Sequence, residues 1–150
     1  MTIKEIYLNI YDLHRYNRYF CYLGCGFYHT TLVIGDKEFD YGPNTGINIQ
    51  NVHDSNLNLN LRESIYLTSI IKSYDEIYNI IKYLEGTYRE NTYNPIGHNC
   101  HNFIEDLYYE VSNKIINLDI PIYLSRFKYF CCCFSCLFPR NNHILKYLIS

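Results

Sequence analysis

The chain has 150 residues, a formal net charge of −2 at pH 7 and a hydrophobic fraction of 48%. This length is typical of a single domain, and the hydrophobic fraction is that of a folded protein, so the composition excludes an intrinsically disordered chain. The near-neutral charge excludes the strongly basic face of a nucleic-acid-binding protein, and no nucleic-acid partner is predicted.

We expect neither secretion nor a membrane-spanning segment. Lys4 and Glu5 interrupt the first residues, where a signal peptide needs a continuous apolar region. The most apolar stretch, residues 130–138, is much shorter than the roughly 20 residues of a transmembrane helix. We therefore expect a cytoplasmic protein, with the nucleus as a second location, whose 7 cysteines stay reduced.

The first part of the chain predicts a strand followed by a hairpin. Residues 6–11 alternate in polarity and are rich in strand-forming side chains. Within residues 28–42, two similar segments flank Gly35-Asp36, a dipeptide suited to the two-residue turn of a β-hairpin. In this register His29 faces Gly42, which has no side chain and therefore leaves room beside the imidazole.

The next segment predicts a loop and then another strand. Residues 43–61 are rich in Asn and contain Pro43 and Gly46, which predicts a long loop with at most short strands. Residues 62–69 alternate weakly, which predicts a strand. Strands therefore account for most of the regular structure expected in the first half of the chain.

The remaining chain has helical periodicity. One helix is predicted to begin at Ser73 or Tyr74 and to stop at Gly86, and a second follows Asn99, a favoured N-cap residue. Residues 120–138 begin with a helix-start proline and predict a short helix or two. Because strands precede helices, we predict an α+β domain with a small antiparallel sheet packed against helices. The apolar stripes of the two main helices are Ile77, Ile80, Ile81 and Leu84, and Phe103, Ile104, Leu107, Tyr108 and Val111.

Cys100 is the first candidate for chemistry. It follows the predicted N-cap, so it occupies the first turn of a helix, where free backbone N–H groups and the helix dipole favour a thiolate. Its spacing to the apolar stripe turns the side chain toward the sheet. Most cysteines of intracellular proteins are simply small buried side chains, so position alone does not establish a nucleophile.

A thiol nucleophile also needs a base that is close in space. His29 is favoured, because a predicted strand holds its ring more rigidly than a loop does. His101 points about 100° away from Cys100 around the helix, and His98 and His53 lack a fixed geometry. In this interpretation His29 takes the thiol proton and later protonates the leaving amine. A purely structural histidine on a sheet face is the alternative.

A thiol hydrolase also needs groups that bind the oxyanion and orient the base. The backbone N–H of Cys100 would bind the oxyanion, helped by one polar side chain. Asn99 and Asp40 are candidates for this oxyanion role or for orienting the base. No cofactor is predicted.

The cysteines near the C-terminus suggest two further hypotheses. Cys133 and Cys136 form one Cys-x-x-Cys motif, but a zinc site needs two more ligands at suitable spacing, so no metal is predicted. Together with Cys131 and Cys132, they lie near basic and aromatic residues and offer sites for reversible palmitoylation, which would give peripheral membrane contact. A packed C-terminal segment without lipid is the alternative.

Five short motifs occur in order: Leu8-Asn9-Ile10-Tyr11-Asp12, Phe27-Tyr28-His29-Thr30, Glu38-Phe39-Asp40-Tyr41-Gly42, Asn99-Cys100-His101-Asn102-Phe103 and Ile120-Pro121-Ile122-Tyr123-Leu124-Ser125-Arg126. Together they resemble the PPPDE-domain desumoylating isopeptidases, thiol peptidases with a permuted papain-like fold. The resemblance implies this domain over residues 3–140, with residues 141–150 as a C-terminal tail.

The same resemblance implies a function. It makes His29 and Cys100 the catalytic dyad of a cysteine isopeptidase that acts on ubiquitin or SUMO conjugates. Two departures concern the substrate groove: Tyr123 stands where the family usually has tryptophan, and Thr68-Ser69 replaces a glycine-containing strand end.

Two other functions remain open. Lecithin:retinol acyltransferase-like proteins also place a strand histidine before an Asn-Cys helix start, so a thioesterase or other acyl-group hydrolase, including a depalmitoylating one, is the alternative enzyme. A module that binds ubiquitin-like proteins without turnover is the alternative that is not an enzyme. Residues 38–42 and 120–126 favour the isopeptidase family.

Overall fold

The computed structural model describes residues 2–13, 26–54, 59–95, 97–115, 117–118, 121 and 123–124. Within these residues, one antiparallel sheet has the strand order β4-β3-β2-β1-β5, and the helices α2 and α3 follow the strands along the chain. The predicted α+β fold, a small antiparallel sheet packed against helices, is confirmed. The elements are β1 (Ile3–Asp12), β2 (Tyr28–Ile34), β3 (Lys37–Gly42), β4 (Gly46–Asn51), the short 3-10 helix η2 (Val52–Asp54), β5 (Asn60–Ile71), α2 (Tyr74–Leu84) and α3 (Cys100–Val111).

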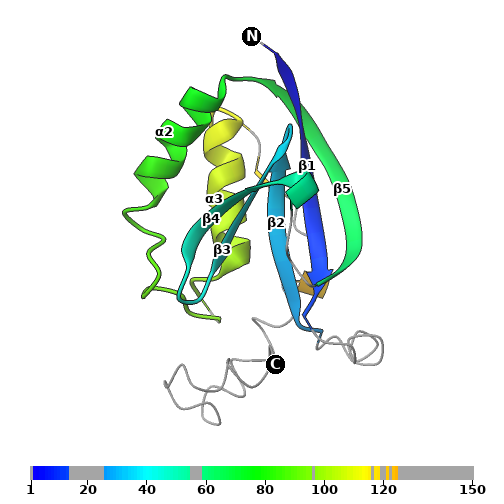
Figure 1. Ribbon diagram of the computed structural model, residues 1–150, viewed down its shortest axis with the longest axis vertical. Helices are drawn as coiled ribbons and strands as arrows, with labels where there is room; N and C mark the ends of the chain where they lie inside the picture. The colour runs from blue at the N-terminus through cyan, green and yellow to red at the C-terminus, as the bar shows by residue number, and fades with distance from the viewer. Residues whose placement is uncertain are drawn as a thin grey trace.

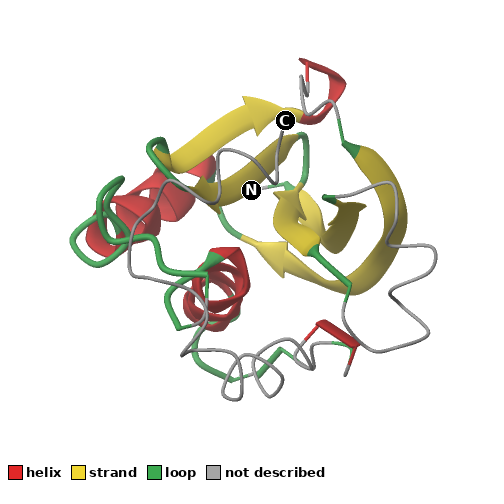
Figure 2. Ribbon diagram, turned by 90° about the horizontal axis from the view of Figure 1, so that it is seen from below, coloured by secondary structure: helices red, strands yellow, loops and turns green. Residues whose placement is uncertain are grey.

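Both helices lie on one side of the curved sheet (Figures 1 and 2). α3 packs against β2, against β3 and against α2, and the core lies between the sheet and the helices. The two-residue period of the strands sends alternate side chains into this core. Its fully buried side chains are Ile6, Leu8 and Ile10 of β1, Leu32 and Ile34 of β2, Phe39 and Tyr41 of β3, Ile77 of α2, and Phe103, Ile104, Leu107 and Val111 of α3.

The predicted hairpin between β2 and β3 is confirmed. Gly35-Asp36 forms its turn, and Gly35 has a φ of 65°, a left-handed conformation that glycine adopts without steric cost. Leu32 pairs with Phe39 in the predicted register. The hairpin therefore follows directly from the local sequence.

The expected pairing of His29 with Gly42 is wrong. Although the structure describes both strands to their ends, pairing between β2 and β3 stops at Leu32 and Phe39. The space beside Gly42 is bordered by Thr45 Oγ1, which lies 3.0 Å from the position of an added Cβ. The ring of His29 consequently has other neighbours.

The segment expected to be a long loop with at most short strands contains one short strand. Its residues 46–51 form the edge strand β4, which pairs with β3 along its whole length. This strand was not evident because, apart from Gly46, its residues are partly or fully exposed and lack a buried apolar face. The strand predicted over residues 62–69 is longer at both ends, as β5.

Several predictions concern residues outside the described ranges. These are the helical segment beyond Leu124, the cysteine cluster of Cys131, Cys132, Cys133 and Cys136, and the tail of residues 141–150. Among the described residues, no helix is long and apolar enough to cross a membrane. The same residues contain no group of three His, Cys, Asp or Glu side chains placed to hold a metal ion.

We predict that Leu107→Ala lowers the free energy of unfolding by about 2–5 kcal/mol, because Leu107 is fully buried in α3. Ile71→Ala removes a similar volume from a residue that is 62% exposed, so it should change that free energy by less than about 0.5 kcal/mol. Urea unfolding followed by circular dichroism measures both values. Equal losses in the two variants would contradict this placement of the core.

Candidate active site

Cys100 is the first residue of α3, and its side chain is 3% exposed. The predicted N-cap, Asn99, is confirmed: its Oδ1 accepts hydrogen bonds from the backbone N–H of His101 at 2.9 Å and of Asn102 at 3.3 Å. Asn102 Oδ1 accepts in return from the backbone N–H of Asn99 at 3.2 Å, which completes a capping box. The thiol therefore lies at a rigid helix start.

Most hydrogen-bonding groups of the Asn99 side chain are used in structural contacts. Besides its two capping bonds, its Nδ2 donates to the backbone carbonyl of Pro95 at 2.8 Å. These contacts occupy the amide oxygen and one of the two N–H donors. The predicted oxyanion role of Asn99 therefore has only one free donor to use.

A hydrogen bond between side chains links α3 to β2. Thr30 Oγ1 lies 2.8 Å from His101 Nδ1, and Thr30 is fully buried. Thr30 directly follows His29, and His101 directly follows Cys100, so the contact holds the two backbone segments together at the same end of the molecule (Figure 1). The backbone segments that carry His29 and Cys100, the predicted catalytic residues, therefore lie close together.

The side chain of His29 takes the opposite direction from that of Thr30. Alternation along β2 places the half-buried His29 on the sheet face away from α3, with Tyr11 as its partner on β1. Burial lowers the pKa of His29 below its ordinary value of 6.5, and the carboxylates of Asp40 and Glu38 partly offset this effect. Among the described residues, no hydrogen bond joins the His29 ring to the Cys100 thiol.

Asp40 lies on β3 and is the charged neighbour that most affects His29. His29 and Asp40 are diagonal neighbours on β2 and β3, displaced from direct opposition by two residues. Thr31 and Glu38 have the same displacement and are joined by a 2.5 Å hydrogen bond. Asp40 is 5% exposed, and burial raises its pKa, whereas His29 and a 3.4 Å hydrogen bond from Asn48 Nδ2 lower it. This placement suits the predicted orienting role of Asp40.

The same face of the sheet holds a buried polar cluster that sequence reasoning missed. Glu38 is 1% exposed, and its Oε1 accepts from Tyr11 Oη at 2.7 Å, Thr31 Oγ1 at 2.5 Å and Asn9 Nδ2 at 3.4 Å. Burial, followed by the bond to Glu38, raises the pKa of Tyr11 to about 12. These donors satisfy a carboxylate that would otherwise be costly to bury.

Tyr93 is a second residue that sequence reasoning missed. Its partly buried side chain interacts with both the thiol and the backbone N–H of Cys100. No local pattern singles it out, because it is one of 18 tyrosines and lies in an irregular segment. Its position depends on the turn that connects it to α3.

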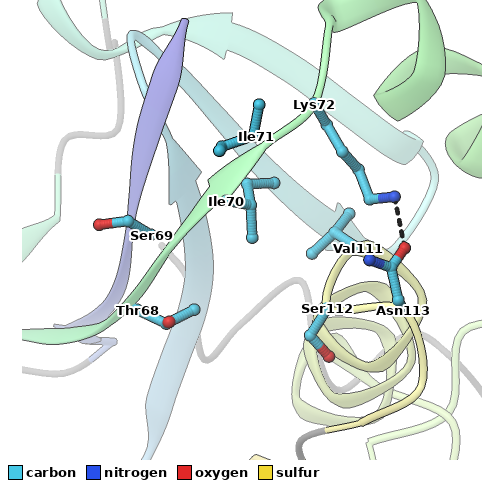
Figure 3. A pocket seen from close by; sticks show the side chains of 8 residues that line it. All are labelled: Thr68, Ser69, Ile70, Ile71, Lys72, Val111, Ser112 and Asn113. Atoms are coloured by element: carbon cyan, nitrogen blue, oxygen red, sulfur yellow. Dashed lines mark hydrogen bonds between the residues drawn. The ribbon is translucent and has the colours of Figure 1, made fainter. Parts of the chain in front are cut away.

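A pocket lies at the other end of α3 (Figure 3). Residues 68–72 at the end of β5 and residues 111–113 at the end of α3 line it, and Lys72 Nζ donates to Asn113 Oδ1 at 2.6 Å. The 12 residues of α3 separate this pocket from Cys100 by about 18 Å. It is therefore distinct from the candidate site.

Comparison with known sequences decides the family. Residues 4–141 match the PPPDE putative peptidase domain. The chain belongs to this family. The resemblance inferred from the five ordered motifs is thereby confirmed, and the fold of the PPPDE chain agrees with it.

Two curated relatives are similar to this PPPDE chain. A DeSI-like protein of Arabidopsis thaliana is 27% identical over 145 residues, which cover 93% of this chain and 62% of the relative. A desumoylating isopeptidase 1 homolog of Caenorhabditis elegans is 28% identical over 126 residues, which cover 79% of this chain and 36% of the relative. The chain therefore spans less than two thirds of the length of either relative.

We predict that Asn99→Ala lowers the free energy of unfolding by about 1 kcal/mol, because it removes the acceptor of the capping box. Asn99→Ser keeps an N-cap acceptor and should recover most of this loss. Thermal and urea unfolding measure both variants. A loss in Asn99→Ser equal to that in Asn99→Ala would show that the cap is not the main task of this side chain.

We predict that His29 titrates below pH 6.5 and that Asp40→Asn moves its titration to still lower pH. The variant removes a negative charge that favours the protonated imidazole, so the proton is lost more easily. NMR of the imidazole resonances follows the titration, and Asp75→Asn on the exposed start of α2 is the control that should leave it unchanged. An upward shift in Asp40→Asn would contradict the proximity of the two side chains.

Proposed function

We propose that this PPPDE domain is a cysteine isopeptidase that hydrolyses conjugates of ubiquitin-like proteins, with Cys100 as nucleophile and His29 as base. The observation that carries the proposal is the Thr30–His101 hydrogen bond of 2.8 Å, since it fixes the strand segment of His29 against the helix start that bears Cys100. Membership of a peptidase family and similarity to a protein named as a desumoylating isopeptidase homolog support the reaction class.

The chemistry follows from the protonation state of His29. A ring whose pKa is lowered by burial is neutral at pH 7 and is free to accept the Cys100 proton. The thiolate then attacks the carbonyl carbon of the isopeptide bond, and the imidazolium donates its proton to the departing lysine amine. Water, deprotonated by His29, releases the acyl group from the sulfur and restores the thiol.

The ring of His29 has to turn toward the thiol for this reaction. No β2–β3 pair restrains this end of β2, because the pairing of the two strands stops at Leu32 and Phe39. Catalytic hydrogen bonds are often long or misaligned without substrate and tighten when substrate binds. We therefore place the productive contact in the substrate complex.

The test is covalent labelling by ubiquitin and SUMO that carry a C-terminal electrophile. Wild type should form an adduct, Cys100→Ser should form none, and His29→Gln should react about 10²–10⁴-fold more slowly. His101→Gln is the matched control, since glutamine can still bond to Thr30 but cannot act as a base.

Three results would count against the proposal. Retained labelling in His29→Gln with loss in His101→Gln would assign the base to His101. Absence of any adduct, combined with hydrolysis of acyl thioesters, would favour the acyl-group hydrolase. Tight binding of ubiquitin-like proteins without adduct or hydrolysis would identify a binding module.

A further inference from the structure

We propose that the hydroxyl of Tyr93 is the second oxyanion donor of this site, acting together with the backbone N–H of Cys100. The proposal rests on the isopeptidase function proposed above and adds to it the group that stabilises the tetrahedral intermediate. Neither the sequence motifs nor the similarity to known proteins assigns a role to this tyrosine.

The backbone between Tyr93 and Cys100 folds back on itself. Asn94 and His98 form an antiparallel bridge, with N–H to carbonyl distances of 2.8 and 2.9 Å in the two directions. Tyr93 directly precedes this bridge and Asn99 directly follows it, so the two residues lie side by side. The bridge thereby sets Tyr93 next to the start of α3.

The ring of Tyr93 packs against the ring of Tyr41. Its centroid lies 5.2 Å from that of Tyr41, which is fully buried. Tyr41 Oη is itself fixed, since it donates to the backbone carbonyl of Arg89 at 3.0 Å and lies 3.0 Å from Thr92 Oγ1. A hydroxyl supported in this way is preorganised, which is the property that makes an oxyanion donor effective.

The hydroxyl of Tyr93 interacts with two groups of Cys100 that bear on the reaction. Burial is the main reason that its pKa is raised, the thiol of Cys100 raises it further, and the backbone N–H of Cys100 lowers it. Tyr93 therefore remains protonated at neutral pH and acts as a donor rather than a base. The Cys100 N–H lowers the pKa of Tyr93 by donating to its hydroxyl oxygen. A carbonyl oxygen placed beside the sulfur would replace that oxygen as the acceptor of the Cys100 N–H and would accept from the Tyr93 hydroxyl as well.

The reaction uses these donors without transferring their protons. When the sulfur forms a bond to the carbonyl carbon, the π electrons of the C=O bond move to oxygen, which then accepts hydrogen bonds from Tyr93 Oη and Cys100 N. When the C–N bond breaks, those electrons return to the C=O bond. Asn99 is less suited to this task, because its oxygen caps the helix and its Nδ2 is bonded to Pro95.

The test is Tyr93→Phe, which keeps the ring and removes only the hydroxyl. We expect kcat for a ubiquitin-like isopeptide substrate to fall about 10²–10³-fold, with KM little changed. Alkylation of Cys100 by iodoacetamide forms no oxyanion. Its rate should therefore fall far less than kcat, and only through the lost contact between the hydroxyl and the thiol. Tyr83→Phe, the same change at a residue that is 73% exposed, should match wild type in every assay.

A second substrate separates this proposal from the isopeptidase proposal. Acylation of Cys100 by p-nitrophenyl acetate also passes through an oxyanion, so Tyr93→Phe should slow it by a similar factor even if no isopeptide is cleaved. Unchanged acylation in a folded Tyr93→Phe variant would overturn the proposal. An equal fall in alkylation and acylation would also overturn it, because it would show that Tyr93 supports the thiolate or the local structure instead.

Discussion

The contact between β2 and the first turn of α3 is the constraint on which the candidate site depends. Leu32 and Phe103 belong to the core that presses the helix onto the sheet, and the Thr30–His101 hydrogen bond of 2.8 Å fixes the register of that contact. His29 on β2 directly precedes Thr30, and Cys100 on α3 directly precedes His101, so each candidate catalytic residue is next to a bonded residue. Core packing thus brings a strand and a helix that are about 70 residues apart into a defined relation.

The two faces of the sheet differ in polarity. One face is apolar and covered by the helices, as expected for an α+β domain. The other face holds the buried carboxylates of Asp40 and Glu38 beside His29. The cost of burying these carboxylates is offset by their hydrogen bonds, and their negative charge opposes the lowering of the His29 pKa. The sheet therefore carries His29 and also, through Asp40 and Glu38, affects its pKa.

Local patterns determined what the sequence could predict. The Gly35-Asp36 turn and the Asn99 cap each depend on a few adjacent residues, so both were predictable. Glu38 was not, because a charged residue in an alternating strand suggests a solvent-facing position, whereas three donors from other positions allow its burial. The role of Tyr93 was hidden because it depends on a backbone bridge in an irregular segment, which no periodicity reveals.

We propose that the thiol of Cys100, the ring of His29 and the hydroxyl of Tyr93 meet at one reacting carbonyl. The most direct measurement is the crystal structure of the chain joined through Cys100 to a ubiquitin-like protein with a C-terminal electrophile. We predict that the His29 ring lies within hydrogen-bonding distance of the sulfur and that the Tyr93 hydroxyl lies on the side of the former carbonyl oxygen. A covalent complex in which His29 stays beside Asp40 and another histidine contacts the sulfur would contradict it.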